Sequence, residues 1–167
     1  MLGTRPIHEV VAHAESFVVA LAGVHGVVVD LGSGGGVPGL VIAHRRPDLE
    51  VVLVDRRATR TDHLHRLVGR LGWSARVRVV TTEAEHVADL LGDRVDAVVA
   101  RGFGSPVATL RAAAPLLRPG GRLVVSEPPS SEPTARWPAD LTPFALQKTP
   151  SPDRRVATFS RSADGST

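Results

Sequence analysis

The order in which apolar and polar stretches follow one another limits the possible folds of this chain more than any other feature. Short runs rich in valine alternate with stretches of helical periodicity, a pattern typical of a parallel sheet flanked by helices. The predicted strands are residues 26–31, 50–55, 76–82, 96–101 and 122–127. The predicted helices between them are residues 38–45, 58–71, 84–91 and 105–117. The chain is therefore expected to form an α/β fold.

The pattern changes after the fifth predicted strand. A proline-rich stretch, residues 128–143, precedes two strand-like runs at 144–148 and 154–160, which are close enough to form a hairpin. The expected sheet is seven-stranded and mostly parallel, with an antiparallel C-terminal hairpin. This is the Rossmann-like arrangement of class I S-adenosylmethionine-dependent methyltransferases. A dinucleotide-binding dehydrogenase would end in a further parallel crossover instead.

The composition fits one globular domain. We expect this domain to span residues 1–161, with an N-terminal helix within 1–23 and a flexible tail at 162–167. The sequence contains no cysteine, which excludes disulfides and a cysteine nucleophile and favours a cytoplasmic protein. Its histidines show no metal-ligand spacing and no apolar run reaches membrane-spanning length, so we expect neither a metal site nor a membrane partner.

A glycine cluster breaks the apolar run of residues 27–43, VVVDLGSGGGVPGLVIA, just after Asp30. Glycines at 32, 34 and 36 permit positive φ and let a ligand approach the backbone, while Pro38 suits the start of a helix. The letters also satisfy the dinucleotide pattern G-x-G-x-x-G, but the first glycine of that pattern follows its strand more closely than Gly34 does. We therefore expect Asp30 to orient the ammonium end of a cofactor.

Asp55 ends the second predicted strand, which lies beside the first in a doubly wound sheet. A carboxylate at this place accepts both hydrogens of a ribose diol. Two other interpretations remain open: Asp55 is a solvated strand end or pairs with Arg56 or Arg57, or these arginines admit a ribose phosphate, as in an oxidoreductase.

Four segments give the sequence a family resemblance: DLGSGGGVPGL (30–40), LVDRRATRTDHL (53–64), TTEAE (81–85) and DAVVARGFGSP (96–106). Together they resemble the bacterial small-subunit ribosomal RNA guanine-N7 methyltransferases of the glucose-inhibited division protein B type, over about residues 26–125. The resemblance implies S-adenosylmethionine as cofactor and ribosomal RNA as partner. Guanine N7 carries a lone pair and no proton, so the lack of an assigned general base is compatible with that acceptor.

Carried over by position, the resemblance implies cofactor contacts at Gly32, Val37, Ala84, Glu85 and Arg101. Arg60 and Leu64 also match residues of the family's helix after the second strand. The whole set of predicted cofactor-binding residues is Asp30, Gly32, Ser33, Gly34, Gly36, Val37, Asp55, Arg56, Ala84, Glu85 and Arg101. No catalytic residue is assigned.

The sequence departs from the family pattern at two places. The family has a longer helical portion before its first strand, so we expect an N-terminally shortened relative. It also tends to place lysine and glycine at the end of the fifth strand, where this chain has Ser126 and Glu127. The alternatives are therefore a small-molecule methyltransferase, a non-catalytic S-adenosylmethionine-binding protein and, with less support, an NAD(P)-dependent oxidoreductase.

Several other side chains have two interpretations each. Phe103 either stacks on a planar substrate or closes the pocket wall, and Trp137 either acts as a lid or covers a helix. The net charge of +3 comes mostly from arginine. The basic residues Arg56, Arg57, Arg60, Arg66 and Arg70 either follow RNA phosphates or form a solvated face, and the solvated face is favoured because no aromatic residues lie among them.

Overall fold

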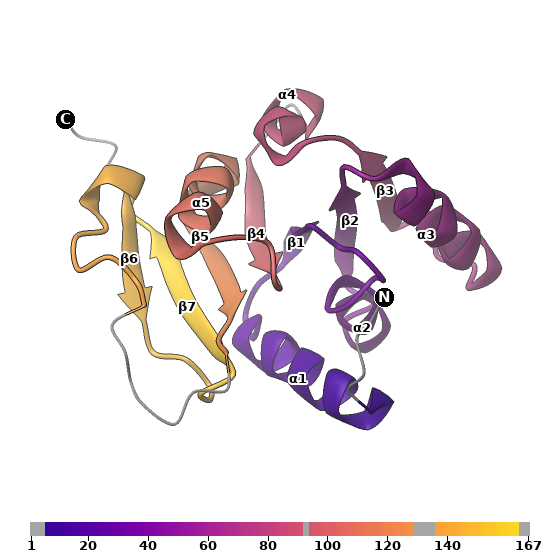
Figure 1. Cartoon of the computed structure of the whole chain (residues 1–167), viewed down its shortest axis with the longest axis horizontal. Helices are drawn as coiled ribbons and strands as arrows, with labels where there is room; N and C mark the ends of the chain where they lie inside the picture. The colour runs from indigo at the N-terminus through magenta and orange to yellow at the C-terminus, as the bar shows by residue number, and fades with distance from the viewer. Residues whose placement is uncertain (1–5, 92–93, 129–135, 164–167) are drawn as a thin grey trace.

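The computed structural model describes residues 6–91, 94–128 and 136–163 and shows one mixed sheet between two layers of helices (Figure 1). The strands are β1 Gly26–Leu31, β2 Leu49–Asp55, β3 Val77–Thr81, β4 Val95–Ala100, β5 Leu117–Ser126, β6 Leu146–Thr149 and β7 Val156–Arg161. The helices are α1 Ile7–Ala20, α2 Gly39–Arg45, α3 Ala58–Arg70, α4 Val87–Leu91 and α5 Pro106–Ala113. Three 3-10 turns, η1 Ala84–His86, η2 Ala114–Leu116 and η3 Thr142–Phe144, complete the described elements.

The seven strands follow the order β3-β2-β1-β4-β5-β7-β6. β1 to β5 pair in parallel, whereas β7 runs antiparallel to both β5 and β6. The predicted seven-stranded sheet with an antiparallel C-terminal hairpin is confirmed. The order reverses between β1 and β4, and in open α/β sheets this switch point is where ligands bind.

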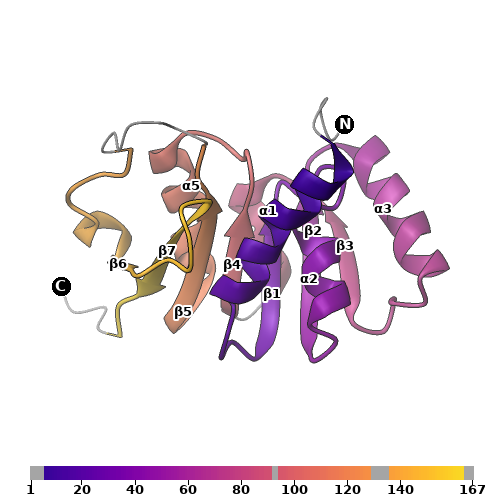
Figure 2. The same ribbon diagram turned by 90° about the horizontal axis from the view of Figure 1, so that it is seen from below.

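Two apolar cores hold the layers together, one on each face of the sheet. One contains Phe17 of α1, Ile42 of α2 and Leu64 of α3, and the other contains Val87 of α4 and Leu110 of α5. Figure 2 shows α1, α2 and α3 along the same side of the strands. Within the described residues, no helix has both the length and the apolar character that crossing a membrane requires.

The helices differ from the predictions mainly at their ends. Pro115 has no N–H and clashes with the preceding turn, so the predicted helix 105–117 divides into α5 and a 3-10 turn. β5 therefore begins at residue 117 rather than 122. The predicted helix 84–91 also begins as a 3-10 turn. In α1, Ile7 is 75% exposed, because the helix contacts the core only from Val10 onward.

Trp137 is buried in the core that contains α5 and does not line the cavity, so it is not a lid over it. Its ring packs edge-on against Phe159 of β7, with 4.9 Å between ring centroids. Its indole N–H donates to Glu127, and the Arg136 guanidinium binds the other carboxylate oxygen of Glu127 at 3.0 Å. Hydrogen bonds thus join the chain after the described gap, at Arg136 and Trp137, to Glu127 at the end of β5. Residues 129–135 of the proline-rich loop lie outside the described residues.

Candidate functional site

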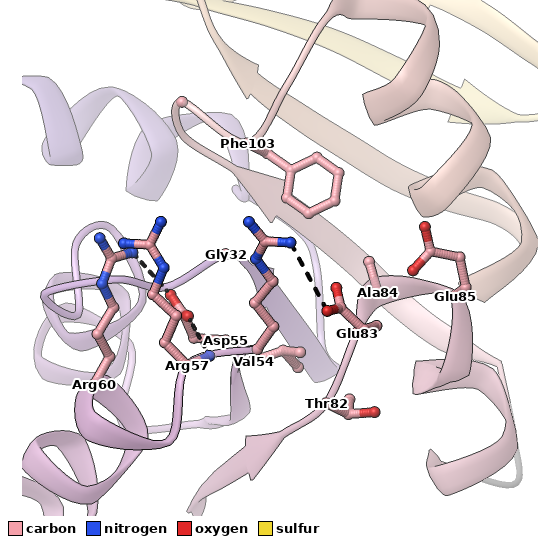
Figure 3. Close-up of a pocket in the computed structure, with 12 residues that line it drawn as sticks. Gly32, Val54, Asp55, Arg57, Arg60, Thr82, Glu83, Ala84, Glu85 and Phe103 are labelled. Carbon is pink, nitrogen blue, oxygen red and sulfur yellow. Dashed lines mark hydrogen bonds and ion pairs between the residues drawn. The ribbon is translucent and has the colours of Figure 1, made fainter.

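A cavity of about 460 Å³ lies at the carboxyl ends of the central strands (Figure 3). Its walls come from the loops that follow β1, β2, β3 and β4, so it occupies the switch point of the sheet. The lining residues are Gly32, Val54, Asp55, Arg56, Arg57, Arg60, Thr82, Glu83, Ala84, Glu85, Gly102 and Phe103. The cavity therefore combines a few apolar surfaces with acids and arginines.

The glycine loop after β1 turns back against β2. Ser33 N–H donates to the Val54 carbonyl at 2.8 Å, and Gly36 N–H donates to the Ser33 carbonyl at 2.7 Å. Gly36 has a φ of +92°, and a β-carbon there would overlap the Leu40 side chain. Only glycine satisfies both conditions without strain. The loop is thus shaped by its own packing as well as by the space it leaves for a ligand.

Asp55 links the end of β2 to the glycine loop, and its side chain is 5% exposed. Oδ2 accepts from Gly34 N–H at 3.0 Å and from Arg60 Nη1 at 3.3 Å, while Oδ1 accepts from Arg57 N–H at 2.9 Å. Burial pushes the pKa of Asp55 upward, but these hydrogen bonds outweigh it and hold the pKa below its ordinary value. Asp55 is therefore an ionised acceptor on the cavity wall.

Asp30 has a different environment. It is 1% exposed, and its Oδ2 accepts from Gly39 N–H at 2.9 Å, at the start of α2. Its Oδ1 is also buried and has no hydrogen-bond partner among the described residues. Burial raises the pKa of Asp30 to about 7, although the Gly39 N–H and the charge of Arg101 act in the opposite direction. This carboxyl group lies beneath the loop and does not line the cavity.

Charged side chains surround the mouth of the cavity. Arg56 lies 3.8 Å from Glu83, and both side chains are well exposed. Figure 3 shows Arg57 and Arg60 extending from the start of α3 on the side opposite Glu83 and Glu85. Acids and arginines thus face each other across the opening.

Phe103 forms part of the cavity wall, a position that fits both interpretations of this residue. A β-carbon on Gly32 would lie 3.1 Å from the phenyl ring, so the ring packs closely over the first residue of the glycine loop. The ring is also packed against the core that contains α5. Phe103 therefore connects the loop after β4 to the loop after β1.

The structure brings five of the eleven predicted residues into the cavity lining: Gly32, Asp55, Arg56, Ala84 and Glu85. The other six, Asp30, Ser33, Gly34, Gly36, Val37 and Arg101, do not line the cavity. Three of these six still act on one of the two acids. Gly34 binds Asp55 through its N–H, and the Ser33 side chain and the charge of Arg101 lower the pKa of Asp30.

No cofactor contact was predicted for several lining residues, including Val54, Thr82, Glu83 and Gly102. Their position directly beside a predicted strand end could have identified them as lining residues, because the carboxyl ends of parallel strands share one edge of the sheet. Metal binding has no support in the described part of the chain, where no three His, Asp or Glu side chains form a group that could hold an ion.

Comparisons with known proteins agree with this geometry. Among solved structures, an O-methyltransferase family protein from Burkholderia thailandensis has a TM-score of 0.67 at 18% identity, covering 96% of this chain and 57% of that one. A SAM-dependent methyltransferase from Thiobacillus denitrificans, in complex with S-adenosyl-L-homocysteine, has a TM-score of 0.59 at 23% identity, covering 74% of this chain and 51% of that one. These likenesses establish the class I methyltransferase fold.

Sequence relatives are more specific. Proteins named ribosomal RNA small subunit methyltransferase G match at 47% identity over 104 residues in Salinispora arenicola and at 42% over 99 residues in Mycobacterium leprae. Both matches cover 58% of this chain, which spans 42% and 39% of the respective relatives. The family model GidB, rRNA small subunit methyltransferase G, matches residues 5–132. The chain therefore belongs to the GidB family.

Proposed function

We propose that this chain binds S-adenosylmethionine in the cavity and transfers its methyl group to RNA, at a guanine N7 of small-subunit ribosomal RNA. The observation that carries the proposal is the ionised, nearly buried Asp55 carboxylate at the switch point, held by the backbone of a glycine loop. Membership of the GidB family supports the choice of cofactor and acceptor. Action on ribosomal RNA would place the protein in the cytoplasm.

The lining residues fit the cofactor's nucleoside. A carboxylate has about four acceptor positions, and Asp55 uses three of them. Binding both ribose hydroxyls requires two positions, so one present partner has to leave. The Arg60 contact is the longest of the three, and Arg60 is the partner that a ribose would replace. Val54 and Ala84 of the cavity wall offer apolar surface for the adenine base.

We propose roles in cofactor binding for four further predicted residues. Gly32 and Val37 would approach the cofactor from the glycine loop, and Glu85 would do so from the turn after β3. Asp30 would act indirectly, by fixing the start of α2 through Gly39.

The chemistry requires little from the protein. The sulfonium of S-adenosylmethionine supplies an activated methyl group when the cofactor is bound. The chain's own residues have to hold the two reactants in line and exclude water. Phe103 and Gly102 lie at the opening, where they can limit access of water to the reacting atoms. A guanine N7 has no proton to lose, so the mechanism needs no general base from the described residues.

A two-part experiment tests the proposal. Isothermal titration with S-adenosylhomocysteine and with NAD(P) should show binding of the first compound alone. Labelled S-adenosylmethionine should then transfer its methyl group to small-subunit ribosomal RNA that lacks the modification, but not to transfer RNA. Binding of NAD(P) alone would reverse the choice of cofactor. Cofactor binding without any transfer to RNA would support the non-catalytic or small-molecule alternatives.

A further inference from the structure

A line of basic residues runs along the outer surface of α3, and we propose that an RNA strand docks on it. The line, called the α3 ridge below, consists of Arg57, Arg60, His63, Arg66 and Arg70. This inference rests on the proposed function and specifies how the RNA acceptor reaches the cavity. It assigns to the ridge the binding of backbone phosphates, which are recognised by charge and not by base sequence.

The spacing of the ridge keeps its members on one side of the helix. Steps of three or four residues from Arg60 to Arg70 place successive basic side chains about one turn apart. The opposite side of α3 is buried against the sheet through Thr61, Leu64 and Val68. His63, Arg66 and Arg70 are exposed, so this part of the ridge faces solvent along the helix for about 10 Å at 1.5 Å per residue.

The arginines of the outer ridge have no acidic partners. Arg66 and Arg70 form no ion pair with any described residue, and Asp62 on the same helix does not pair with them. By contrast, Arg45 and Arg118 each lie 2.6 Å from an acidic oxygen. Unpaired cations in a row create a positive potential that attracts a polyanion.

The ridge begins at the cavity. Arg57 and Arg60, its first two members, line the cavity wall, and Figure 3 shows both side chains at the opening beside Asp55. Figure 1 shows α3 at the outer edge of the molecule beside β3, where no other described element covers it. A strand held along the ridge would therefore lead toward the cavity, where the acceptor base has to arrive.

An RNA strand fits the ridge better than an anionic membrane does. Helices that bind membranes insert an exposed apolar side between lipid headgroups. The apolar side of α3 is instead covered by the sheet, and Leu64 and Val68 are fully or almost fully buried. The ridge consequently offers charge without an apolar surface to insert.

The test uses a short fluorescein-labelled single-stranded RNA and measures its anisotropy with the full chain at several salt concentrations. The test variant is Arg66→Gln/Arg70→Gln. The matched control is Arg111→Gln, because Arg111 is also an exposed arginine in the last turn of a helix, α5, on the other face of the sheet. Each lost phosphate contact lowers the salt slope by about 0.7 for single strands, so two lost contacts weaken binding about 25-fold at about 0.1 M salt. The control should bind like the wild type.

Three outcomes would overturn the inference: wild-type protein that does not bind the RNA, a double variant that keeps wild-type affinity and salt slope, or a control that loses as much affinity as the double variant. Binding to phosphatidylserine vesicles in place of RNA would also overturn it. Hydrogen exchange on the wild type gives a check without substitutions, since RNA should protect α3 and not α5. Titration with S-adenosylhomocysteine tests the proposed function separately and should give equal affinity in all variants.

Discussion

The buried carboxyl group of Asp30 predicts an unusual pH dependence of stability. Its environment favours the neutral form, because the side chain is 1% exposed and one oxygen has no hydrogen-bond partner among the described residues. Asp30→Asn keeps the shape of the side chain and an oxygen that can accept from Gly39 N–H. The substitution removes only the ability to ionise, so it isolates the effect of the charge.

The size of the effect follows from the two pKa values. Burial raises the pKa of Asp30 from its ordinary value of 3.8 to about 7. Between these values the folded protein holds a proton that the unfolded chain has lost, so the free energy of unfolding falls as pH rises. Each pH unit corresponds to about 1.4 kcal/mol, and the interval of about three units gives a loss of roughly 4 kcal/mol. The loss begins near pH 4 and is complete just above pH 7.

The measurement is urea denaturation followed by circular dichroism, for both proteins, at several pH values between 4 and 8. Carboxyl groups that do not interact with Asp30 contribute equally to both curves, including Asp48, whose pKa is lowered. The difference between the two proteins therefore reports on Asp30. We expect Asp30→Asn to gain roughly 4 kcal/mol relative to the wild type between pH 4 and pH 8.

A difference that stays constant over this range would refute the reasoning. It would mean that Asp30 ionises at its ordinary pKa, with its charge fully compensated by Arg101 and the helix start. A difference that changes in the opposite direction would mean that the folded protein stabilises the ionised form of Asp30.

Three further substitutions test the site and its supports. Asp55→Ala should weaken S-adenosylhomocysteine binding by about 1–3 kcal/mol, the cost of unpaired polar groups, and unchanged affinity in a calorimeter would place the ribose elsewhere. Gly36→Ala should destabilise the fold by about 1–3 kcal/mol, because its β-carbon would overlap Leu40 at a positive φ; a normal urea midpoint would contradict this. Trp137→Phe should cost about 1–3 kcal/mol by leaving Glu127 without its indole donor, whereas equal thermal stability would show that this hydrogen bond contributes little.

The sequence was sufficient to predict the sheet because its strands are uniform apolar runs. β1, β2 and β4 are buried on both faces. Valine-rich runs of that kind are typical of the central strands of a parallel sheet. The helix ends were less predictable, since they depend on local competition. Pro115 ended α5 early, and Leu71 lies 44% exposed just past α3 although it continues the apolar spacing of that helix. Periodicity identifies a helix face but not the residue at which the helix leaves the core.

The two acids of the site show why the sequence predicted one side chain and misplaced the other. Both were expected to point into the crevice from the ends of neighbouring strands. Asp55 is the last residue of β2 and lies at the rim, whereas β1 continues past Asp30 to Leu31. Asp30 pairs with Leu53, so it lies two residues further down in the sheet than Asp55 does. A register difference of this size cannot be read from either strand alone.

The two acids are nevertheless parts of one structure, and the glycine loop connects them. Asp30 accepts from Gly39 at the far end of the loop, and Asp55 accepts from Gly34 near its start. A β-carbon on Gly39 would lie 2.6 Å from the Asp30 carboxylate, so glycine is needed there for the buried hydrogen bond to form. Asp30 thus fixes the glycine loop through Gly39, and the loop in turn holds Asp55 through Gly34. Residues that never contact a cofactor would set the position of the one carboxylate that does, which is why Asp30→Asn should change stability more than it changes affinity.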